Sequence, residues 1–113
     1  MNVEFEQKSQ YKLAKINGEL NTETAPDFAE TMLEHALGSD ARLIIDLSAL
    51  RSIDSTGLSV LINLGVRSRM SQGRLILSSP TLMVQGVLEV SRLDQFFEIC
   101  ETFEEAEAKI LAD

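Results

Sequence analysis

Residues 43–58 read Leu-Ile-Ile-Asp-Leu-Ser-Ala-Leu-Arg-Ser-Ile-Asp-Ser-Thr-Gly-Leu, and within them the chain changes from one periodicity to another. Residues 42–47 are nearly all apolar, which is typical of a strand that is covered on both faces. From about Thr56 to Met70, apolar residues recur at the spacing of one helical face. The sequence therefore predicts a buried strand that ends at Leu47, followed by a helix with Ser55 at its N-terminus.

The same alternation continues on both sides of this stretch. Further strands are expected at residues 3–6, 11–16, 75–77 and 96–100, with Gly18 closing the second strand. Further helices are expected at residues 25–37, 80–90 and 103–110. We expect Thr22 or Thr24 to cap the first of these, Gly38 to end it, Ser79-Pro80 to open the next and Thr102 to cap the last.

Alternation of strands and helices implies an α/β fold with a mostly parallel sheet. The two leading strands add an antiparallel pair, so the sheet is mixed. We expect about four to five strands covered by about four α-helices. With 113 residues and 44% apolar content, the chain can bury one core, which predicts a single domain over residues 1–113.

Composition indicates a soluble cytoplasmic protein without membrane insertion. No apolar run approaches the length of a membrane span, and no basic-then-apolar leader stands at the N-terminus. A single cysteine, Cys100, excludes an internal disulfide and fits a reducing compartment. We expect Cys100 to lie in the core rather than to act as a nucleophile.

The formal net charge of −8 argues against a nucleic-acid partner. We expect the ten Lys and Arg residues to be scattered rather than gathered in one patch. An acidic chain of this kind would suit a basic patch on a protein partner. A monomer is the expected state of such a small charged domain.

The sequence lacks the residue sets that common enzyme chemistry needs. His35 is the only histidine and lies on the expected first helix, where a packed or boundary position is the simpler interpretation. One Cys and one His cannot supply a zinc site. Neither a G-x-x-x-x-G-K-[ST] loop nor a G-x-G-x-x-G turn is present. Asp46 or Asp54 could suggest the phosphate-accepting aspartate of a response regulator. That chemistry also needs an acidic pair after the first strand and a later lysine, and the sequence has neither. We therefore expect no catalytic residues, no metal and no cofactor.

Ser55 has two interpretations at the start of a helix. Unpaired backbone N–H groups and the positive dipole end favour an anion there, so an exposed hydroxyl could be phosphorylated without loss of the fold. The alternative is an ordinary N-cap. Thr56 is the second candidate acceptor, Asp54 is expected to orient the turn, and Gly57 is expected to let a partner approach closely.

Three stretches carry a resemblance to a known family. Residues 46–50 (Asp-Leu-Ser-Ala-Leu) and 53–58 (Ile-Asp-Ser-Thr-Gly-Leu) resemble the signature of STAS domains, and residues 16–22 (Ile-Asn-Gly-Glu-Leu-Asn-Thr) resemble the segment after the family's second strand. Ser79-Pro80, Leu93 and Phe97 fit the last third, so the resemblance covers nearly the whole chain. It is most specific to the bacterial anti-sigma factor antagonists.

The resemblance implies a partner switch. In that family the unmodified antagonist binds an anti-sigma factor that is itself an ATP-dependent serine kinase, and this binding releases the sigma factor. Phosphorylation of the serine in the D-S-[ST]-G-L run, here Ser55, ends binding, and a serine phosphatase resets the switch. ATP belongs to the kinase. The expected partner-binding residues are Asn21, Thr22, Asp54, Ser55, Thr56, Gly57 and Leu58.

One position departs from the family's pattern. The segment after the second strand often ends in aspartate, which lies near the phosphorylation site, and here Asn21 stands in its place. Independently of the resemblance, asparagine is a common turn residue at a helix entry.

Three other functions compete with the phosphorylation switch. A STAS-type accessory subunit of a membrane transport complex would use the same loop to dock constitutively. A partner-switching module could control a target other than a sigma factor. An enzyme for a small nucleotide or acyl substrate is a third class, although no catalytic residue set supports it.

Overall fold

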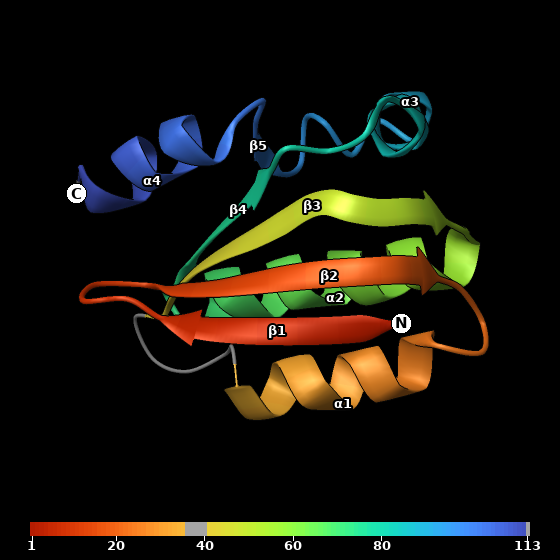
Figure 1. The fold of residues 1–113 in the computed structure, drawn as a ribbon, viewed down its shortest axis with the longest axis horizontal. Coiled ribbons are helices and arrows are strands. Elements are labelled where there is room, and N and C mark those ends of the chain that lie inside the picture. The colour runs from red at the N-terminus through yellow and green to blue at the C-terminus, as the bar shows by residue number, and fades with distance from the viewer. Residues whose placement is uncertain (36–40, 113) are drawn as a thin grey trace.

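The computed structural model describes residues 1–35 and 41–112, and the described residues form one five-stranded sheet in the order β1-β2-β3-β4-β5. The strands are β1 (Asn2–Gln7), β2 (Lys12–Leu20), β3 (Arg42–Ile53), β4 (Arg74–Ser78) and β5 (Glu98–Cys100). β1 is antiparallel to β2, whereas all other neighbouring strands are parallel (Figure 1). The predicted mixed, mostly parallel sheet is confirmed.

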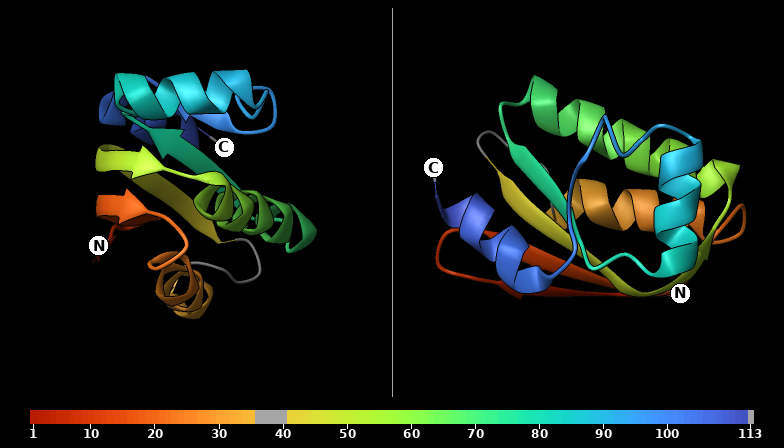
Figure 2. Two further views of the ribbon diagram at one scale, coloured as in Figure 1. Left: turned by 90° about the vertical axis from the view of Figure 1, so that its right-hand side faces the viewer. Right: turned by 90° about the horizontal axis from the view of Figure 1, so that it is seen from above.

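The helices of the described residues are α1 (Ala25–His35), α2 (Ser55–Met70), α3 (Leu82–Val90) and α4 (Phe103–Leu111). Successive residues of a strand point to opposite faces, so Ile44 and Ile45 enter different cores. Ile45 packs in the larger core with α1, α2 and α3, whereas Ile44 packs in a smaller core beneath α4. The sheet is thus covered on both faces, which confirms the predicted α/β class (Figure 2).

Two strands continue further than the sequence predicts. β2 does not close at Gly18 but runs to Leu20, and β3 does not end at Leu47 but runs to Ile53. Gly18 has φ +121°, which glycine adopts readily, and the β2–β3 register shifts beside it. A bulge thus replaces the expected strand end. β2 leads to the turn before α1, and β3 leads to the turn before α2.

Two predicted element starts were also misplaced. The third helix begins at Leu82 with Thr81 as its N-cap, rather than at Pro80. Ser79 has φ 57°, so the residue before the proline forms a turn instead of a cap. The last strand begins at Glu98 rather than at residue 96. By contrast, Thr102 caps α4 as predicted, since its Oγ1 accepts a hydrogen bond from Glu105 N (3.1 Å).

The end of α1 and its histidine are only partly described. The predicted terminator Gly38 lies outside the described residues. His35 is the last residue of α1, and its side chain also lies outside what the structure describes.

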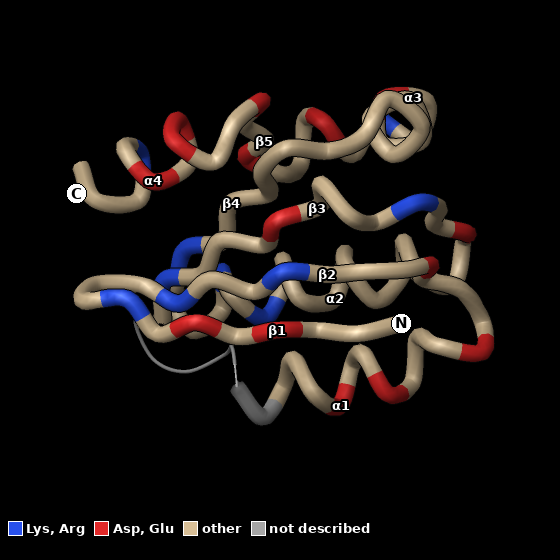
Figure 3. Tube along the Cα trace, viewed as in Figure 1, with Lys and Arg blue, Asp and Glu red and all other residues tan. Residues whose placement is uncertain are grey.

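Basic residues gather at one end of the folded chain, although they are scattered in the sequence. Lys12, Arg42 and Arg74 begin three neighbouring strands, and Arg67 and Arg69 lie in the last turn of α2 (Figure 3). Arg42 and Arg74 donate hydrogen bonds to the carbonyls of the last turn of α4. The expectation of dispersed positive charge was therefore wrong in three dimensions.

None of the helices in the described part of the chain is both long and apolar enough to cross a lipid bilayer.

Candidate functional site at the start of α2

Two parallel strands end together and hold the turn that leads into α2. Leu20, the last residue of β2, pairs in register with Ile53, the last residue of β3. The backbone N–H of Asp54 donates to the carbonyl of Leu20 (3.1 Å). Because both strand ends are buried and hydrogen-bonded, the turn at residues 54–56 has a fixed position at the carboxyl edge of the sheet.

Asp54 is the N-cap of α2. Its backbone is extended, with φ −104° and ψ −174°, and its Oδ1 accepts a hydrogen bond from Gly57 N (2.9 Å). Its carbonyl accepts from Leu58 N (2.9 Å). The prediction that Asp54 orients the turn is confirmed, and the alternative in which Ser55 is the N-cap is wrong.

Ser55 is the first residue of α2 and is exposed to solvent. Its backbone carbonyl accepts a hydrogen bond from the hydroxyl of Ser59 (3.0 Å). Among the described residues, no side-chain or backbone group bonds the Ser55 hydroxyl itself. The N-terminal N–H groups of α2 that capping leaves unpaired lie beside this hydroxyl, where they favour negative charge.

Thr56 differs from Ser55 although both are exposed. The Oγ1 atoms of Thr56 and Thr22 lie 3.2 Å apart, at hydrogen-bonding distance. The contact links the first turn of α2 to the turn between β2 and α1. Of the two candidate acceptors, Thr56 is the one whose hydroxyl is already engaged.

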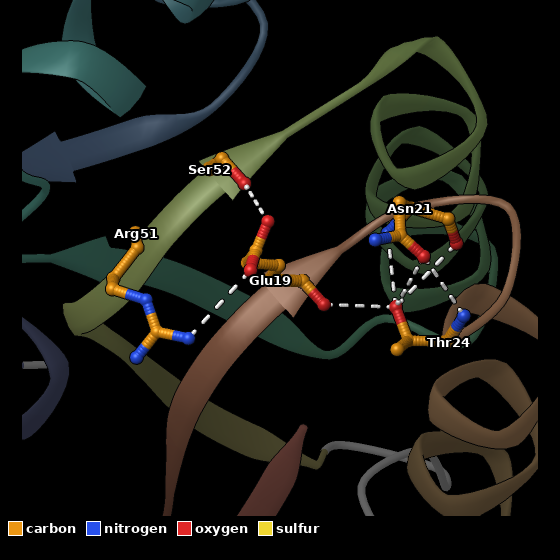
Figure 4. Close-up of polar contacts among 5 residues, drawn as sticks. All are labelled: Glu19, Asn21, Thr24, Arg51 and Ser52. Carbon is orange, nitrogen blue, oxygen red and sulfur yellow. Dashed lines mark hydrogen bonds and ion pairs between the residues drawn. The ribbon is translucent and has the colours of Figure 1, made fainter.

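The turn between β2 and α1 is organised by Asn21. Its Oδ1 accepts hydrogen bonds from the backbone N–H groups of Glu23 (2.9 Å) and Thr24 (3.2 Å), as expected for an asparagine at a helix entry. The Thr24 hydroxyl accepts from Asn21 N (2.9 Å) and donates to the carbonyl of Glu19 (2.9 Å) (Figure 4). The Thr24 side chain therefore points back to β2 instead of capping α1 as predicted.

Glu19 connects this turn to β3, and sequence reasoning did not include it in the site. Its carboxylate accepts from the Ser52 hydroxyl (3.1 Å) and lies 3.7 Å from the Arg51 guanidinium (Figure 4). Glu19 belonged to the stretch that carried the family resemblance, so its position could have been noticed. No pattern in the sequence pointed to Arg51 or Ser52, because their proximity to Glu19 depends on the β2–β3 register.

Gly57 is buried and faces the interior of the protein. A Cβ atom placed there would lie 2.7 Å from Leu20 Cγ and 2.9 Å from Ile53 Cγ1. The missing side chain therefore allows α2 to pack closely on the ends of β2 and β3. Gly57 was expected to let a partner approach closely, but the atoms that its missing side chain would meet belong to Leu20 and Ile53 of this chain.

The remaining predicted site residues surround the turn at different depths. Asp54, Ser55, Thr56 and Thr22 are exposed, whereas Asn21 and Leu58 are half-buried. Leu58 packs against the larger core. The fold thus brings all seven predicted partner-binding residues to one end of the molecule, although only some of them present a side chain to solvent.

Cys100 lies in the smaller core beneath α4, as predicted. Burial raises the pKa of its thiol, which favours the protonated, unreactive form.

A cavity of about 100 Å³ lies at the other end of α2, beside Phe96, Phe97 and Glu98. Two arginines line it and both have partners. Arg74 forms a bidentate ion pair with Glu98, with both N···O distances at 2.9 Å, and the Arg69 guanidinium carbon lies 4.2 Å from the centroid of the Phe96 ring.

Among the described residues, no cluster of three His, Cys, Asp or Glu side chains could hold a metal ion. The turn at Ser55 is therefore the stronger candidate site.

Comparison with known proteins agrees with this fold. The family model described as the STAS domain matches residues 2–106. A candidate anti-sigma factor antagonist of Thermotoga maritima is 34% identical over 91 residues, which is 80% of each chain. A crystal structure of a candidate anti-sigma factor antagonist from the same species superimposes with a TM-score of 0.89 at 29% identity, covering 96% of this chain and 93% of that one.

More distant structures share the fold alone. The anti-sigma factor antagonist SpoIIAA in its unphosphorylated form has a TM-score of 0.78 at 20% identity, with 99% of this chain and 98% of that chain covered. A sulfate transporter family protein from Wolinella succinogenes has a TM-score of 0.76 at 18% identity, with 88% and 84% covered.

The chain belongs to the STAS domain family. Within that family it is similar to candidate anti-sigma factor antagonists of the Thermotoga genus.

Proposed function

We propose that this protein is an anti-sigma factor antagonist whose binding is controlled by phosphorylation of Ser55. The observation that carries the proposal is the Ser55 hydroxyl, which is exposed and lacks a hydrogen-bond partner among the described residues at the N-terminus of a helix. The unmodified protein would bind a cytoplasmic anti-sigma factor with serine kinase activity and release its sigma factor. A serine phosphatase would restore the unmodified form.

Charge supplies the physical basis of the switch. A phosphoryl group adds about −1.5 to −2 charge units at neutral pH. It would stand beside the Asp54 carboxylate, at the centre of the face that docks on the kinase. Desolvation of this charge and repulsion from the kinase-bound nucleotide oppose docking. A coupling of roughly 1–3 kcal/mol would weaken binding by about one to two orders of magnitude.

The fold can carry the added charge without rearrangement. Within the described part of the chain, the Ser55 hydroxyl makes no contact that modification would break, and the N–H groups at the start of α2 favour an anion. Thr56 is the less suitable acceptor because its hydroxyl pairs with Thr22. Modification of Thr56 would first have to break that contact.

Asn21 stands where the family usually has an aspartate, and this difference is compatible with the proposal. The side-chain Oδ1 of Asn21 holds the turn by accepting two backbone hydrogen bonds, and an aspartate oxygen would do the same. The uncharged amide removes one negative charge from the neighbourhood of Ser55. We expect this change to ease the approach of the phosphoryl donor, whose phosphates are also negative.

The test compares wild-type, Ser55→Ala and Ser55→Asp proteins as immobilised baits in lysate of the native host. Retained proteins are identified by mass spectrometry and assayed for transfer of phosphate from ATP to the wild-type chain. A serine kinase held by wild type and Ser55→Ala but released by Ser55→Asp supports the proposal. Equal retention by all three baits, or recovery of membrane-transport components instead, contradicts it.

A further inference from the structure

The cavity at the C-terminal end of α2 contains polar groups that the site at Ser55 does not use. Its volume is about 100 Å³, and its walls come from α2, from β4 and from the chain around the start of β5. Ser55 begins α2 and Ser68 lies in its last turns, so roughly 20 Å of helix separates the cavity from the candidate phosphorylation site. A small molecule in this cavity would not touch the face around Ser55.

Ser68 is a buried polar residue in the wall of this cavity, where it is only 4% exposed. The neighbouring wall residue Gly73 leaves the Ser68 hydroxyl uncovered, because a Cβ atom at Gly73 would lie 3.3 Å from Ser68 Oγ. No group among residues 1–35 and 41–112 bonds this hydroxyl. Leaving a buried hydroxyl without a partner is costly, so a hydrogen-bonding atom inside the cavity would offset that cost.

Arg69 brings a positive charge to the same cavity. Its Nη2 donates a hydrogen bond to the carbonyl of Phe96, and its guanidinium carbon lies 4.2 Å from the centroid of the Phe96 ring. These two contacts hold the guanidinium in place. Most of its N–H groups nevertheless have no acceptor in the described part of the chain. A guanidinium that is held in place with N–H groups to spare is well suited to a carboxylate.

The ion pair between Arg74 and Glu98 sets the net charge of the cavity wall. Nε and Nη2 of Arg74 each donate to a different oxygen of Glu98, at 2.9 Å. The hydrogen bonds from Arg74 lower the pKa of Glu98, so this carboxylate is ionised at neutral pH. Together with Arg69, the wall carries two positive charges and one negative charge. A monoanion balances this excess, whereas a dianion such as phosphate would place uncompensated negative charge beside Glu98.

Apolar side chains form the rest of the wall and limit the size of a ligand. Leu75 and Phe97 are buried, and the Phe96 ring meets the Phe97 ring edge to face with 4.8 Å between their centroids. An apolar cavity of about 150 Å³ can hold benzene, so the smaller volume here suits a molecule with fewer atoms. A short alkyl chain fits beside these rings, whereas a nucleotide or a long fatty acid does not.

We propose that this cavity binds a short aliphatic monocarboxylate of the size of acetate or propionate. The carboxylate accepts hydrogen bonds from the Arg69 guanidinium and the Ser68 hydroxyl, and the alkyl end lies against Leu75 and Phe97. This inference does not depend on the proposed function, because binding at this end of α2 would stand whether or not Ser55 is phosphorylated.

A titration followed by NMR tests the site on the full chain, with sodium propionate added to the ¹⁵N-labelled protein in a buffer free of carboxylates. The amide signals of Gly65, Ser68 and Gly73 should shift and saturate with a Kd of about 1 mM, as expected for so small a ligand. Propionamide keeps the shape without the charge, and chloride keeps the charge without the chain. Each should bind at least about tenfold more weakly, because each lacks one of the two contacts. Equal binding of propionate and propionamide, or of propionate and chloride, would overturn the inference, and so would the absence of saturable shifts at these three amides.

Three variants assign the contacts. Ser68→Ala and Arg69→Gln should each weaken propionate binding by about tenfold, the usual effect of losing a hydrogen bond to a charged group. Arg67→Gln is the matched control, since it removes the same charge from the last turn of α2 at a residue that is not part of the cavity wall. Arg69→Gln also loses the contact with Phe96, so its amide spectrum checks the fold, and Ser68→Ala decides alone if that variant unfolds. Unchanged binding in Ser68→Ala would overturn the inference, and so would equal weakening by Arg67→Gln and Arg69→Gln, because the effect would then be one of overall charge.

Discussion

The hydroxyl oxygens of Thr22 and Thr56 lie 3.2 Å apart and join the β2–α1 turn to the first turn of α2. This contact distinguishes the hydroxyls of Ser55 and Thr56. The Thr56 hydroxyl has a partner, whereas no group among residues 1–35 and 41–112 bonds the Ser55 hydroxyl. It also holds the Asn21 turn against the helix that carries the candidate phosphorylation site.

Removing the Thr22–Thr56 contact should have a small effect on stability and a larger one on acceptor choice. Both residues are exposed, so we expect a coupling of up to ~0.5 kcal/mol in a double-mutant cycle of Thr22→Val and Thr56→Val, measured by urea unfolding. In Thr22→Val the Thr56 hydroxyl is released. Site mapping by mass spectrometry after incubation with kinase should then detect phosphothreonine at position 56, which wild type should lack. Modification of Ser55 alone in both proteins would argue against this selectivity.

Gly57→Ala should destabilise the fold rather than act on binding alone. The added Cβ would meet Leu20 and Ile53 at 2.7 and 2.9 Å, so we expect a loss of about 1–3 kcal/mol in the free energy of unfolding. The matched control is Gly86→Ala, which has open space and should gain about 0.5–1 kcal/mol. Equal stability of the two variants in denaturant unfolding would contradict the packing described here.

Two substitutions separate the effect of the Asp54 capping hydrogen bond from the effect of its charge. Asp54→Ala removes the acceptor of the Gly57 N–H and should cost about 0.5–2 kcal/mol, measured by thermal unfolding. Asp54→Asn keeps an oxygen in the capping position and should retain most of that stability. If both variants lose the same stability, the charge of Asp54 rather than its capping bond stabilises α2.

Ser55 variants should fold normally, which the binding test requires. Ser55 is the first helical residue and not the cap, so Ser55→Ala should change stability by less than about 0.5 kcal/mol. Ser55→Asp places a negative charge in the first turn of α2 and should stabilise it by about 0.3–1 kcal/mol at low salt. Circular dichroism and thermal unfolding check both, and a loss above that range in Ser55→Ala would indicate an unrecognised contact.

Tyr11 should titrate above the usual range for tyrosine. Burial raises the pKa of Tyr11, and the hydrogen bond from its hydroxyl to Glu107 raises it further. A raised pKa means that the unfolded chain loses this proton first, so the stability associated with the neutral phenol is present below about pH 10 and falls above it. Tyr11 is the only tyrosine, so absorbance near 295 nm reports it alone. Ionisation near pH 10 while the protein remains folded would contradict the buried hydrogen bond.

The sequence predicted elements best where a pattern was continuous. The apolar run at the start of β3 and the helical spacing of α2 identified a strand followed by a helix, and Thr102 marked the start of α4 correctly. Element ends were less predictable. Gly18 was expected to end β2 because glycine weakens a strand, but the paired β3 backbone carries β2 past it through a bulge. Ser79-Pro80 has the composition of a helix start, yet Thr81 provides the cap.

The site was predicted only in part, because local patterns reveal some of its residues and strand pairing decides the others. Asp54, Ser55, Thr56 and Asn21 could be selected from local turn and capping chemistry together with the family resemblance. Glu19, Arg51 and Ser52 could not be linked, because a shift of one residue in the β2–β3 register would turn these side chains to other faces. The role of Gly57 was misjudged because nothing local indicates that its missing side chain faces Leu20.

The sequence by itself determined the α/β class, the order of strands and helices, and the position of Ser55 at the start of a helix, because periodicity and capping act between residues a few positions apart. Only the tertiary structure decided that Asp54 caps this helix, that no group of the described residues bonds the Ser55 hydroxyl, and that the Thr56 hydroxyl contacts that of Thr22. These relations depend on strand register and on the packing of helices across the sheet, which bring together residues that are far apart in the chain.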